Sequence, residues 1–413
     1  MVDFKLLPLP QGIRLYIHVP FCRSKCPYCD FYSVSNAGLE LTEAIVQGTL
    51  AELKHFLTLL GRPQLKSVYI GGGTPSLLPP DLLDTLLAAV AAEIGRRAPG
   101  KAPESTGCTE YTIEANPESL SPRFLEICAR RGVNRVSLGV QSFQPRLLRI
   151  LGRPGNAEHN RRALTLTSEQ WQGSFNLDLL AGIPGQQAED LDDDLRQVLA
   201  ARPDHVSLYA LTPPAGSRLA EQIEPRLQEE LWFRGFEILE TRGYQNYEIA
   251  NFALPGKECG HNLAYWRLDP YLGVGPGAVS TLPGLSGEVL RLYNPHDLKL
   301  FLRGQAESWG LQRETVTPRE FLFEHLMLGF RMRRGVDAGR FYARFGASLP
   351  ELLPRLWDSW RGRNLVAGES KSWRLSDSGR FILDSLLLEV QEALENLPEA
   401  KHRFDWALRS DGR

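Results

Sequence analysis

Short apolar runs alternate with longer amphipathic stretches through the first half of the chain. The short runs are rich in β-branched residues and predict buried strands at residues 14–19, 66–70, 110–114, 135–140, 174–180 and 204–210. Apolar residues recur at helical spacing at residues 41–60, 80–94, 122–131, 157–171, 188–201 and about 221–242. Repeated β/α units joined by short loops predict a parallel sheet with right-handed crossovers.

Six such units rather than eight would form a partial barrel, open on one side. The apolar pattern alone leaves a flat, doubly wound sheet as an alternative, because both arrangements are built from the same units. We expect residues 1–245 to form one α/β core and residues 246–315 to form a connecting segment.

The last third of the chain has a different pattern. Helices are predicted at residues 319–331, 337–345 and 349–363, followed by a strand pair at about 365–375 and a helix from Asp377. This order resembles a winged-helix unit, which we expect over residues 316–390. Residues 391–413 are predicted to form a polar tail.

Arginine is dense in this last part of the chain. The residues are Arg331, Arg333, Arg334, Arg340, Arg344, Arg355, Arg361 and Arg363. DNA binding is one hypothesis for such a unit, but the chain of 413 residues has a net charge of −2 and no broad basic field. A cap over the open barrel, or a docking surface for a protein partner, fits better, and we expect no nucleic acid as a partner.

The overall composition is that of an ordinary globular protein, with 43% hydrophobic and 23% charged residues. No run of about 18 apolar residues occurs, so we expect no transmembrane segment. Cys108, Cys128 and Cys259 are widely separated and form no disulfide framework. A reduced, cytoplasmic setting is therefore expected.

The other cysteines form a dense motif just after the first predicted strand. Cys22, Cys26 and Cys29 have the spacing C-x3-C-x2-C, which suits three corners of a cubane iron–sulfur cluster. With no fourth cysteine nearby, one iron would keep an open site for a small molecule, much as catalytic zinc does. The alternatives are a zinc knuckle or three unrelated thiols, but zinc needs four ligands and no second cysteine pair is present.

Polar residues follow the other predicted strands at their carboxyl ends. Glycines 71 to 73 and Thr74 follow the second strand, and Glu114, Gln141, Asp178 and Ala210 lie at or near the ends of later strands. In parallel α/β folds this edge is where ligands bind. Glycines there let a backbone approach a ligand, although a tight turn explains a glycine run equally well.

These motifs together resemble the radical S-adenosylmethionine (SAM) superfamily and, more narrowly, the oxygen-independent coproporphyrinogen III oxidase family. The resemblance rests on Y-I-H-V-P-F-C-x3-C-x-Y-C-D-F, G-G-G-T-P, E-A-N-P, G-V-Q-S-F and L-Y-A-L-T, and residues 96–108 stand out as a local insertion. It favours the partial barrel, and it implies a 4Fe–4S cluster with SAM on its open iron. The implied SAM contacts are Tyr16, Tyr28, Gly72, Gly73, Thr74, Glu114, Gln141, Arg153, Asp178 and Ala210.

Two features resemble a heme-chaperone branch of this family. The dehydrogenase branch has a further cysteine two residues after the third cluster thiol, where this chain has Phe31. The segment from His261 to Trp266, H-N-L-A-Y-W, is similar to an H-N-x-x-Y-W motif of the chaperone branch. The resemblance implies a protein that binds heme and passes it to an acceptor protein.

A heme site needs an apolar slot with aromatic walls and an axial ligand, commonly histidine. His261, Tyr265 and Trp266, with Tyr271 nearby, are the candidates for such a site, and Cys259 is an alternative ligand. A capped histidine in a packed loop is the competing interpretation.

Two other functions stay open from the sequence. One is a dehydrogenase that would cleave SAM, with an electron donor, to act on coproporphyrinogen III. The other is a zinc-bound regulatory module. A heme acceptor in a respiratory membrane would imply only peripheral attachment, because no anchor is visible.

Overall fold

The computed structural model describes residues 6–9, 12–95, 108–285, 288–367 and 371–397. Its central sheet contains the six predicted parallel strands, paired in chain order. They are β1 (Ile13–Val19), β4 (Leu65–Gly72), β5 (Glu110–Ala115), β6 (Arg135–Gln141), β7 (Ser174–Ala181) and β8 (His205–Ala210). The predicted core of six β/α units is confirmed.

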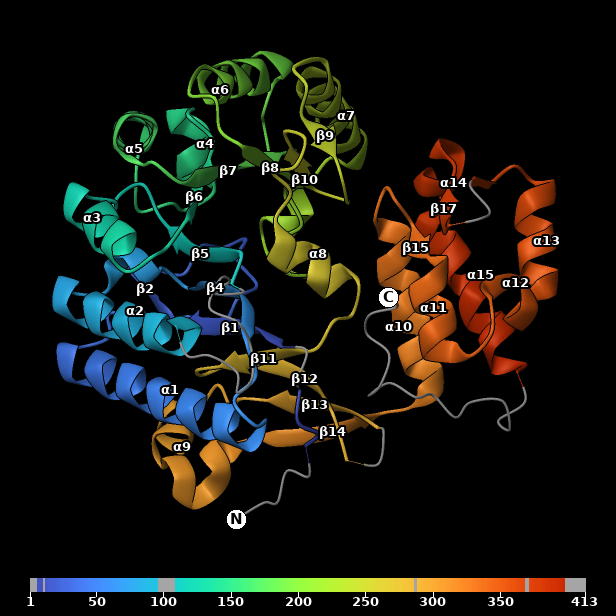
Figure 1. Cartoon of the computed structure of the whole chain (residues 1–413). Coiled ribbons are helices and arrows are strands. Elements are labelled where there is room, and N and C mark those ends of the chain that lie inside the picture. The colour runs from blue at the N-terminus through green and yellow to red at the C-terminus, as the bar shows by residue number, and fades with distance from the viewer. Residues whose placement is uncertain (1–5, 10–11, 96–107, 286–287, 368–370, 398–413) are drawn as a thin grey trace.

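The connecting helices all cover the outer face of this sheet (Figure 1). They are α1 (Leu39–Leu59), α2 (Pro80–Gly95), α3 (Pro122–Arg130), α5 (Ala157–Gln170), α6 (Ala188–Ala200) and α7 (Pro225–Thr241). A doubly wound sheet would reverse its strand order and carry helices on both faces. Sequential strands with helices outside curve instead into a partial barrel, as expected.

Local elements differ from the prediction where proline sets a helix start. The helix expected at 221–242 is a short turn, η2 (Ala220–Gln222), followed by α7, which begins at Pro225. The short helix α4 (Pro145–Ile150) was not predicted. Two short strands of the cysteine loop, β2 (Phe21–Cys22) and β3 (Val34–Ser35), and a turn η1 (Pro75–Leu77) complete this half. The expected insertion at 96–108 falls almost wholly outside the described residues.

The segment expected as a connection extends the sheet at both edges. Strands β10 (Asn251–Ala253) and β9 (Gln245–Asn246) continue antiparallel from β8, while β11 (Tyr271–Val274) pairs parallel with β1. Beyond β11 the antiparallel strands β12 (Val279–Pro283), β13 (Val289–Tyr293) and β14 (Gln312–Val316) follow, with α9 (Leu298–Leu302) and η3 (Gly304–Gly310) between the last two. Within the described ranges the sheet therefore contains twelve strands.

The last part of the chain forms a separate helical unit with its own hydrophobic core. Its helices are α10 (Pro318–Arg331), α11 (Ala338–Phe345), α12 (Leu349–Leu352), α13 (Pro354–Gly362), α14 (Asp377–Phe381) and α15 (Leu383–Glu395). Its wing consists of β15 (Val336–Asp337), β16 (Val366–Ala367) and β17 (Ser372–Leu375). The winged-helix-like order is confirmed, except that Pro354 splits the helix expected at 349–363.

The tail expected from residue 391 starts later than the pattern suggested. Helix α15 continues to Glu395, and Leu394 is buried in the core of the C-terminal unit. Residues 398–413 lie outside the described part. None of the described helices has both the length and the apolar character needed to cross a membrane.

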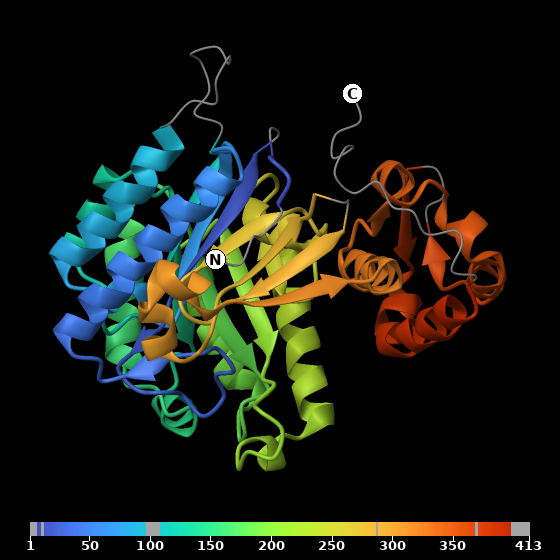
Figure 2. The same cartoon turned by 90° about the horizontal axis from the view of Figure 1, so that it is seen from below.

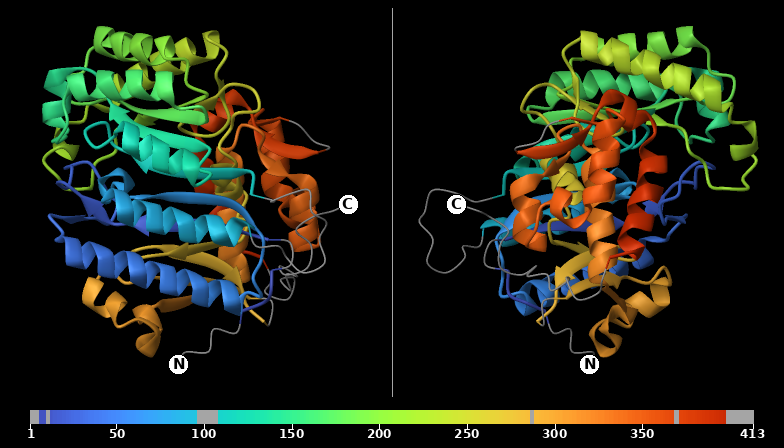
Figure 3. Two further views of the ribbon diagram at one scale, coloured as in Figure 1. Left: turned by 60° about the vertical axis from the view of Figure 1, so that its left-hand side comes forward. Right: turned by 90° about the vertical axis from the view of Figure 1, so that its right-hand side faces the viewer.

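The C-terminal unit stands beside the barrel (Figures 2 and 3). Asp269, just before β11, forms ion pairs with Arg14 at the start of β1 and with Arg340 and Arg344 of α11. Arg344 also donates to the carbonyl oxygen of Arg267, at 2.6 Å. The unit therefore docks near the amino ends of the strands.

Helix α8 (Gly260–Trp266) lies between the barrel and the C-terminal unit (Figure 1). Glu110 at the start of β5 binds its first turn, accepting from the backbone nitrogens of Gly260 at 2.8 Å and His261 at 3.0 Å. A carboxylate there satisfies unpaired amides and complements the helix dipole. The helix carrying the H-N-x-x-Y-W sequence is thus fixed to the inner side of the sheet.

Candidate functional site

A cavity of 470 Å³ opens at the carboxyl ends of the parallel strands, and Cys22, Cys26 and Cys29 all line it. The cysteines lie on the loop after β1, whose turn is closed by a hydrogen bond from the Cys29 nitrogen to the Cys26 oxygen at 3.0 Å. Cys22 Sγ lies 3.6 Å from Thr74 Oγ1, which belongs to the loop after β4. The predicted thiol motif and the predicted glycine motif therefore meet at one site.

Arg153 is the charged neighbour of these thiols. Its side chain is buried, donates to the carbonyl oxygen of Gly139 at 2.8 Å and lies 3.7 Å from Glu118 Oε2. Burial raises the pKa of Cys26, while the Arg153 guanidinium works to lower it. A fixed positive charge next to a buried thiol favours the thiolate, which is the form that binds iron.

The glycines after β4 are required by close backbone packing. Gly72 has a φ of +101°, and a Cβ there would lie 2.3 Å from the His18 ring. At Gly73 a Cβ would meet the carbonyl oxygen of Val19 at 2.6 Å. The sequence G-G-G-T-P therefore places bare backbone beside the cysteine loop, and both Gly72 and Gly73 line the cavity.

Glu114 at the end of β5 is held by neutral donors. Its carboxyl oxygens accept from Tyr69 Oη at 2.8 Å and from the Gly72 nitrogen at 3.0 Å. Burial, with a smaller contribution from the nearby Asp178 carboxylate, raises the pKa of Glu114 to about 7. A cationic ligand in the cavity would supply the positive charge that these contacts do not.

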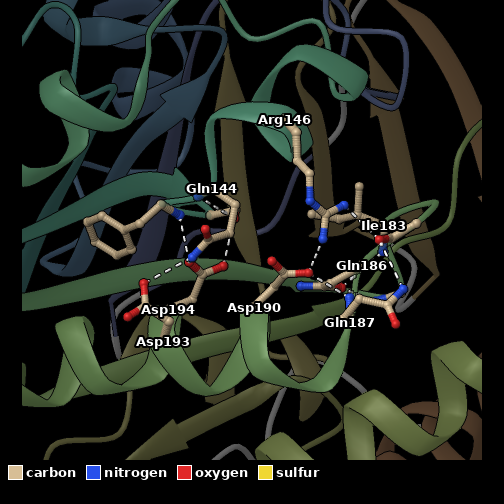
Figure 4. A network of polar contacts seen from close by, with 12 residues as sticks. Gln144, Arg146, Ile183, Gln186, Gln187, Asp190, Asp193 and Asp194 are labelled. Carbon is tan, nitrogen blue, oxygen red and sulfur yellow. Dashed lines mark hydrogen bonds and ion pairs between the residues drawn. The ribbon is translucent and has the colours of Figure 1, made fainter.

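Gln141 is positioned by the loop that follows it. Its own φ is +70°, and the next residues, Ser142 and Phe143, donate to the two oxygens of Asp194 at 2.6 and 2.8 Å. Figure 4 shows Asp193 and Asp194 of α6 facing Gln144 of the same loop. The buried carboxylate thus fixes the backbone turn that places Gln141 at the cavity.

The same figure shows a second attachment between these segments. Arg146 of α4 pairs with Asp190 of α6 and donates to the carbonyl oxygen of Gly185 at 2.6 Å (Figure 4). Gln186 accepts from the Ile183 nitrogen at 3.1 Å, which closes the loop after β7. The loops after β6 and β7 are therefore bound to one helix.

Side chains near the starts of β7 and β8 form a buried polar network. Asn176 donates to Asp178 at 2.7 Å and to Ser137 at 2.8 Å, and its oxygen lies 2.6 Å from His205 Nδ1. Burial raises the pKa of Asp178 and lowers that of His205 well below its usual value. At neutral pH His205 is therefore an uncharged link in this network.

Nine of the ten residues predicted to contact SAM line this cavity. They are Tyr28, Gly72, Gly73, Thr74, Glu114, Gln141, Arg153, Asp178 and Ala210. Tyr16 is not among the lining residues, because its ring stacks behind that of Tyr69 and its hydroxyl lies 2.9 Å from His18 Nδ1. Its predicted contact would have to act through Tyr69.

Further residues of the cavity were missed by the sequence analysis. They are Glu118, Arg135, Ser137, Asn176, His205, Ser207 and Asn262, among others. Several share a simple signal, since Arg135, Ser137 and Gly139 occupy alternate positions of β6, as His205 and Ser207 do in β8. Polar residues at every second position of a buried strand indicate the inner face of a barrel.

The three residues proposed for heme are not brought together around one cavity. His261 is buried, its Nδ1 lies 3.0 Å from Ser67 Oγ, and burial lowers its pKa to about 4. Tyr265 is half exposed and packs on Tyr271, while Trp266 lines a different cavity. Cys259 is buried and donates to Glu110 at 3.2 Å. The structure gives His261 the surroundings of a packed core histidine.

Two family models match separate parts of the chain. A family model described as the radical SAM superfamily matches residues 16–198, and one described as the HemN C-terminal domain matches residues 316–382. Heme chaperone HemW of Escherichia coli (strain K12) is 36% identical over 388 residues, which cover 92% of this chain and 98% of that protein. The chain belongs to the HemW family.

Two further relatives, one bacterial and one mitochondrial, also match most of this chain. Heme chaperone HemW of Bacillus subtilis (strain 168) is 31% identical, covering 89% of this chain and 96% of that protein. The mitochondrial radical S-adenosyl methionine domain-containing protein 1 of Mus musculus is 32% identical, covering 94% of this chain and 90% of that protein.

A solved structure shares the fold of this HemW family member. Coproporphyrinogen III oxidase (HemN) from Escherichia coli, a radical SAM enzyme, superposes with a TM-score of 0.76 at 20% identity, covering 92% of this chain and 90% of that chain. This likeness confirms the α/β fold with its helical C-terminal unit.

The cavity has the donors that the cofactors of a HemW family member require. Among the described residues, no group of three or more histidine, cysteine or carboxylate side chains could hold a single metal ion. Three separate thiols line the cavity, and its lining also includes two buried polar atoms without a hydrogen-bond partner, Arg135 Nε and Glu118 Oε2, the latter 3.7 Å from Arg153. Buried polar atoms are rarely left unpaired, so a polar ligand suits this cavity.

Proposed function

We propose that this protein is a heme chaperone, which binds heme and transfers it to an acceptor protein. The observation that carries the proposal is the 36% identity, over nearly the whole chain, to a protein named heme chaperone HemW. The cavity with its three thiols supports the accompanying proposal of a cluster and SAM. A reducing compartment such as the cytoplasm would suit both.

In this proposal the cysteine loop holds a 4Fe–4S cluster through Cys22, Cys26 and Cys29. Such a cluster, when bound, supplies an open Lewis-acid iron and one-electron chemistry. Arg153 favours the thiolate of Cys26, Glu114 offers a countercharge to the SAM cation, and Gln141 offers an amide to its polar groups. If SAM is cleaved, an electron donor is also required.

Phe31 is the residue that separates this proposal from dehydrogenase activity. By the family resemblance it occupies the position of the further cysteine in the dehydrogenase branch, and the residue is 62% exposed and lines the cavity. Since three thiols suffice for SAM cleavage, the distinction has to be tested by assay.

The first test is heme binding by anaerobically reconstituted protein. Wild-type protein should give a Soret band that saturates on titration with heme, and the bound heme should pass to apomyoglobin, used as a generic acceptor. Cys26→Ser should lose the visible cluster absorption and the acid-labile sulfide but keep its circular dichroism, because the barrel core does not include the cluster.

Incubation with SAM, a reductant and coproporphyrinogen III distinguishes the alternative. We expect no protoporphyrinogen beyond the amount of protein present. Accumulation over many turnovers would replace the chaperone proposal by the dehydrogenase, and a colourless, iron-free product of reconstitution would refute the cluster.

A further inference from the structure

A second cavity of 470 Å³ lies between α8 and the C-terminal unit, on the side away from the cysteines. We call it the interunit cavity. Its walls come from the end of α8, the turn after α10, the start of α11 and strand β17. Figure 1 shows α8 facing these segments. Its volume is within the range of about 300–1,000 Å³ typical of ligand sites.

The lining of the interunit cavity has an excess of positive charge. The cations are Arg267, Arg334, Arg340, Lys371 and Arg374, and the carboxylates are Glu258 and Asp337. Asp337 is already used as the N-cap of α11, where it accepts from the Arg340 nitrogen at 2.7 Å. The cavity therefore attracts anions.

Some of these cations have a protein partner and others do not. Arg334 lies 3.7 Å from Glu258, and Arg340 pairs with Asp269. Among the described residues no carboxylate forms an ion pair with Arg267, Lys371 or Arg374. Burial and, to a smaller extent, the neighbouring Arg340 lower the pKa of Arg267, while Asp269 acts in the opposite direction.

The lining of the interunit cavity also has an apolar part. Trp266 and Leu263 are partly buried there, and Met332 and Val336 are buried. A lining that combines apolar and cationic side chains fits a ligand with a flat hydrophobic body and carboxylates at one edge.

We propose that the interunit cavity binds heme, with the propionate carboxylates paired to Arg267, Lys371 and Arg374 and the macrocycle packed against Trp266. This inference rests on the proposed function and states where in the molecule heme would bind. It also gives the tryptophan of H-N-x-x-Y-W a direct role and leaves the histidine of that motif a structural one.

Iron ligation by histidine is not part of this site. His325 is the imidazole among the described lining residues, and its Nδ1 accepts a hydrogen bond from Arg344 Nη1 at 3.0 Å. Because arginine can only donate, the proton of the neutral ring lies on Nε2, which then has no lone pair for iron. Binding that depends on carboxylates and packing is readily reversible, which suits a carrier.

The contribution of the heme propionates is tested first, with wild-type protein. Heme and heme dimethyl ester, presented in the same detergent, should differ in affinity by about tenfold or more, since each charge-assisted contact contributes on that order. This comparison needs no variant and therefore does not depend on the folding of one.

The cations are tested by charge reversal. Lys371→Glu/Arg374→Glu should weaken heme binding about tenfold or more and remove the preference for heme over its ester. The matched control is Arg226→Glu/Arg355→Glu, which makes the same charge change at two exposed residues outside the cavity. It should bind both ligands like wild type.

The outcomes separate this inference from the proposed function. Equal affinity of wild type for heme and ester, or binding by the cavity variant equal to that of the control, refutes the interunit cavity while heme binding itself stands. Wild-type protein that binds no heme refutes both.

Discussion

At the scale of single residues, Glu114 connects the fold to ligand binding. Its carboxyl lies between Tyr69 and the backbone of Gly72, and burial keeps its pKa near 7. Such a group is about half ionised at neutral pH, so small changes in its surroundings alter its charge.

We predict that SAM affinity depends on pH through this residue. Because the folded pKa of Glu114 is raised, the carboxyl is mostly neutral at pH 6 and mostly ionised at pH 8. A cationic ligand should therefore bind about tenfold more tightly at pH 8 than at pH 6. Anaerobic calorimetry measures this difference.

Glu114→Gln is the control, because it keeps an oxygen to accept from Tyr69 but cannot ionise. It should bind SAM weakly with a much flatter pH dependence, while any titration of the ligand itself stays the same. An identical pH dependence in variant and wild type would exclude Glu114 as the countercharge.

Most of the residues predicted for the site line the cavity, because its chemistry restricts residue types and spacing. The thiol spacing and the polar strand ends predict Cys22, Gly72 and Asp178 directly, and the cavity brings them together. Tyr16 could not be placed, since its inward position depends on stacking with a residue of the next strand.

At the scale of elements, α8 shows why the heme residues were harder to place. It has seven residues, too few to be stable alone, and its first turn depends on Glu110, which is 150 residues away from Gly260 in the chain. No local pattern reveals such a partner. The short strands β9 to β14 were missed for the same reason, because each is stabilised by neighbours rather than by its own sequence.

We predict that Glu110→Ala selectively loosens α8. Removing the carboxylate leaves the amides of Gly260 and His261 without their acceptor, which should reduce the free energy of opening of α8 by about 1–3 kcal/mol. Hydrogen exchange of the α8 amides measures this change, with the amides of α5 as an internal reference.

Glu110→Gln keeps one acceptor oxygen and should lose less protection. Unchanged exchange of α8 in the alanine variant would show that packing alone holds the helix.

At the scale of the whole molecule, Asp269 joins the barrel to the C-terminal unit. It is buried and pairs with Arg14 on one side and with Arg340 and Arg344 on the other. The position of this unit could not be predicted from the sequence, which gave its winged-helix order but not the carboxylate that orients it. The cap expected over the open barrel lies near the amino ends of the strands, and no described residue of the unit lines the cysteine cavity.

We predict that Asp269→Asn separates the stabilities of the two units. Losing the carboxylate leaves buried arginines without a countercharge, which should cost about 3 kcal/mol or more. Hydrogen exchange followed by mass spectrometry at increasing urea should show peptides of α10 and α15 losing protection at a lower urea concentration than peptides of the barrel helices α1 and α5.

Asp358→Asn, at an exposed position of α13, is the matched control and should unfold like wild type. Coincident transitions in the Asp269 variant, at the wild-type midpoint, would show that this carboxylate does not hold the units together.

The pairing of β11 with β1 affects how the nascent chain matures on the ribosome. In the described part of the chain, one edge of the first strand is paired with residues 271–274, which are synthesised more than 250 residues later. Until those residues emerge, the growing polypeptide presents an unsatisfied row of amides and carbonyls, which is a template for intermolecular pairing. Completion of the barrel is therefore a late event in translation. Protection by protein-folding chaperones matters most while that strand edge is unpaired.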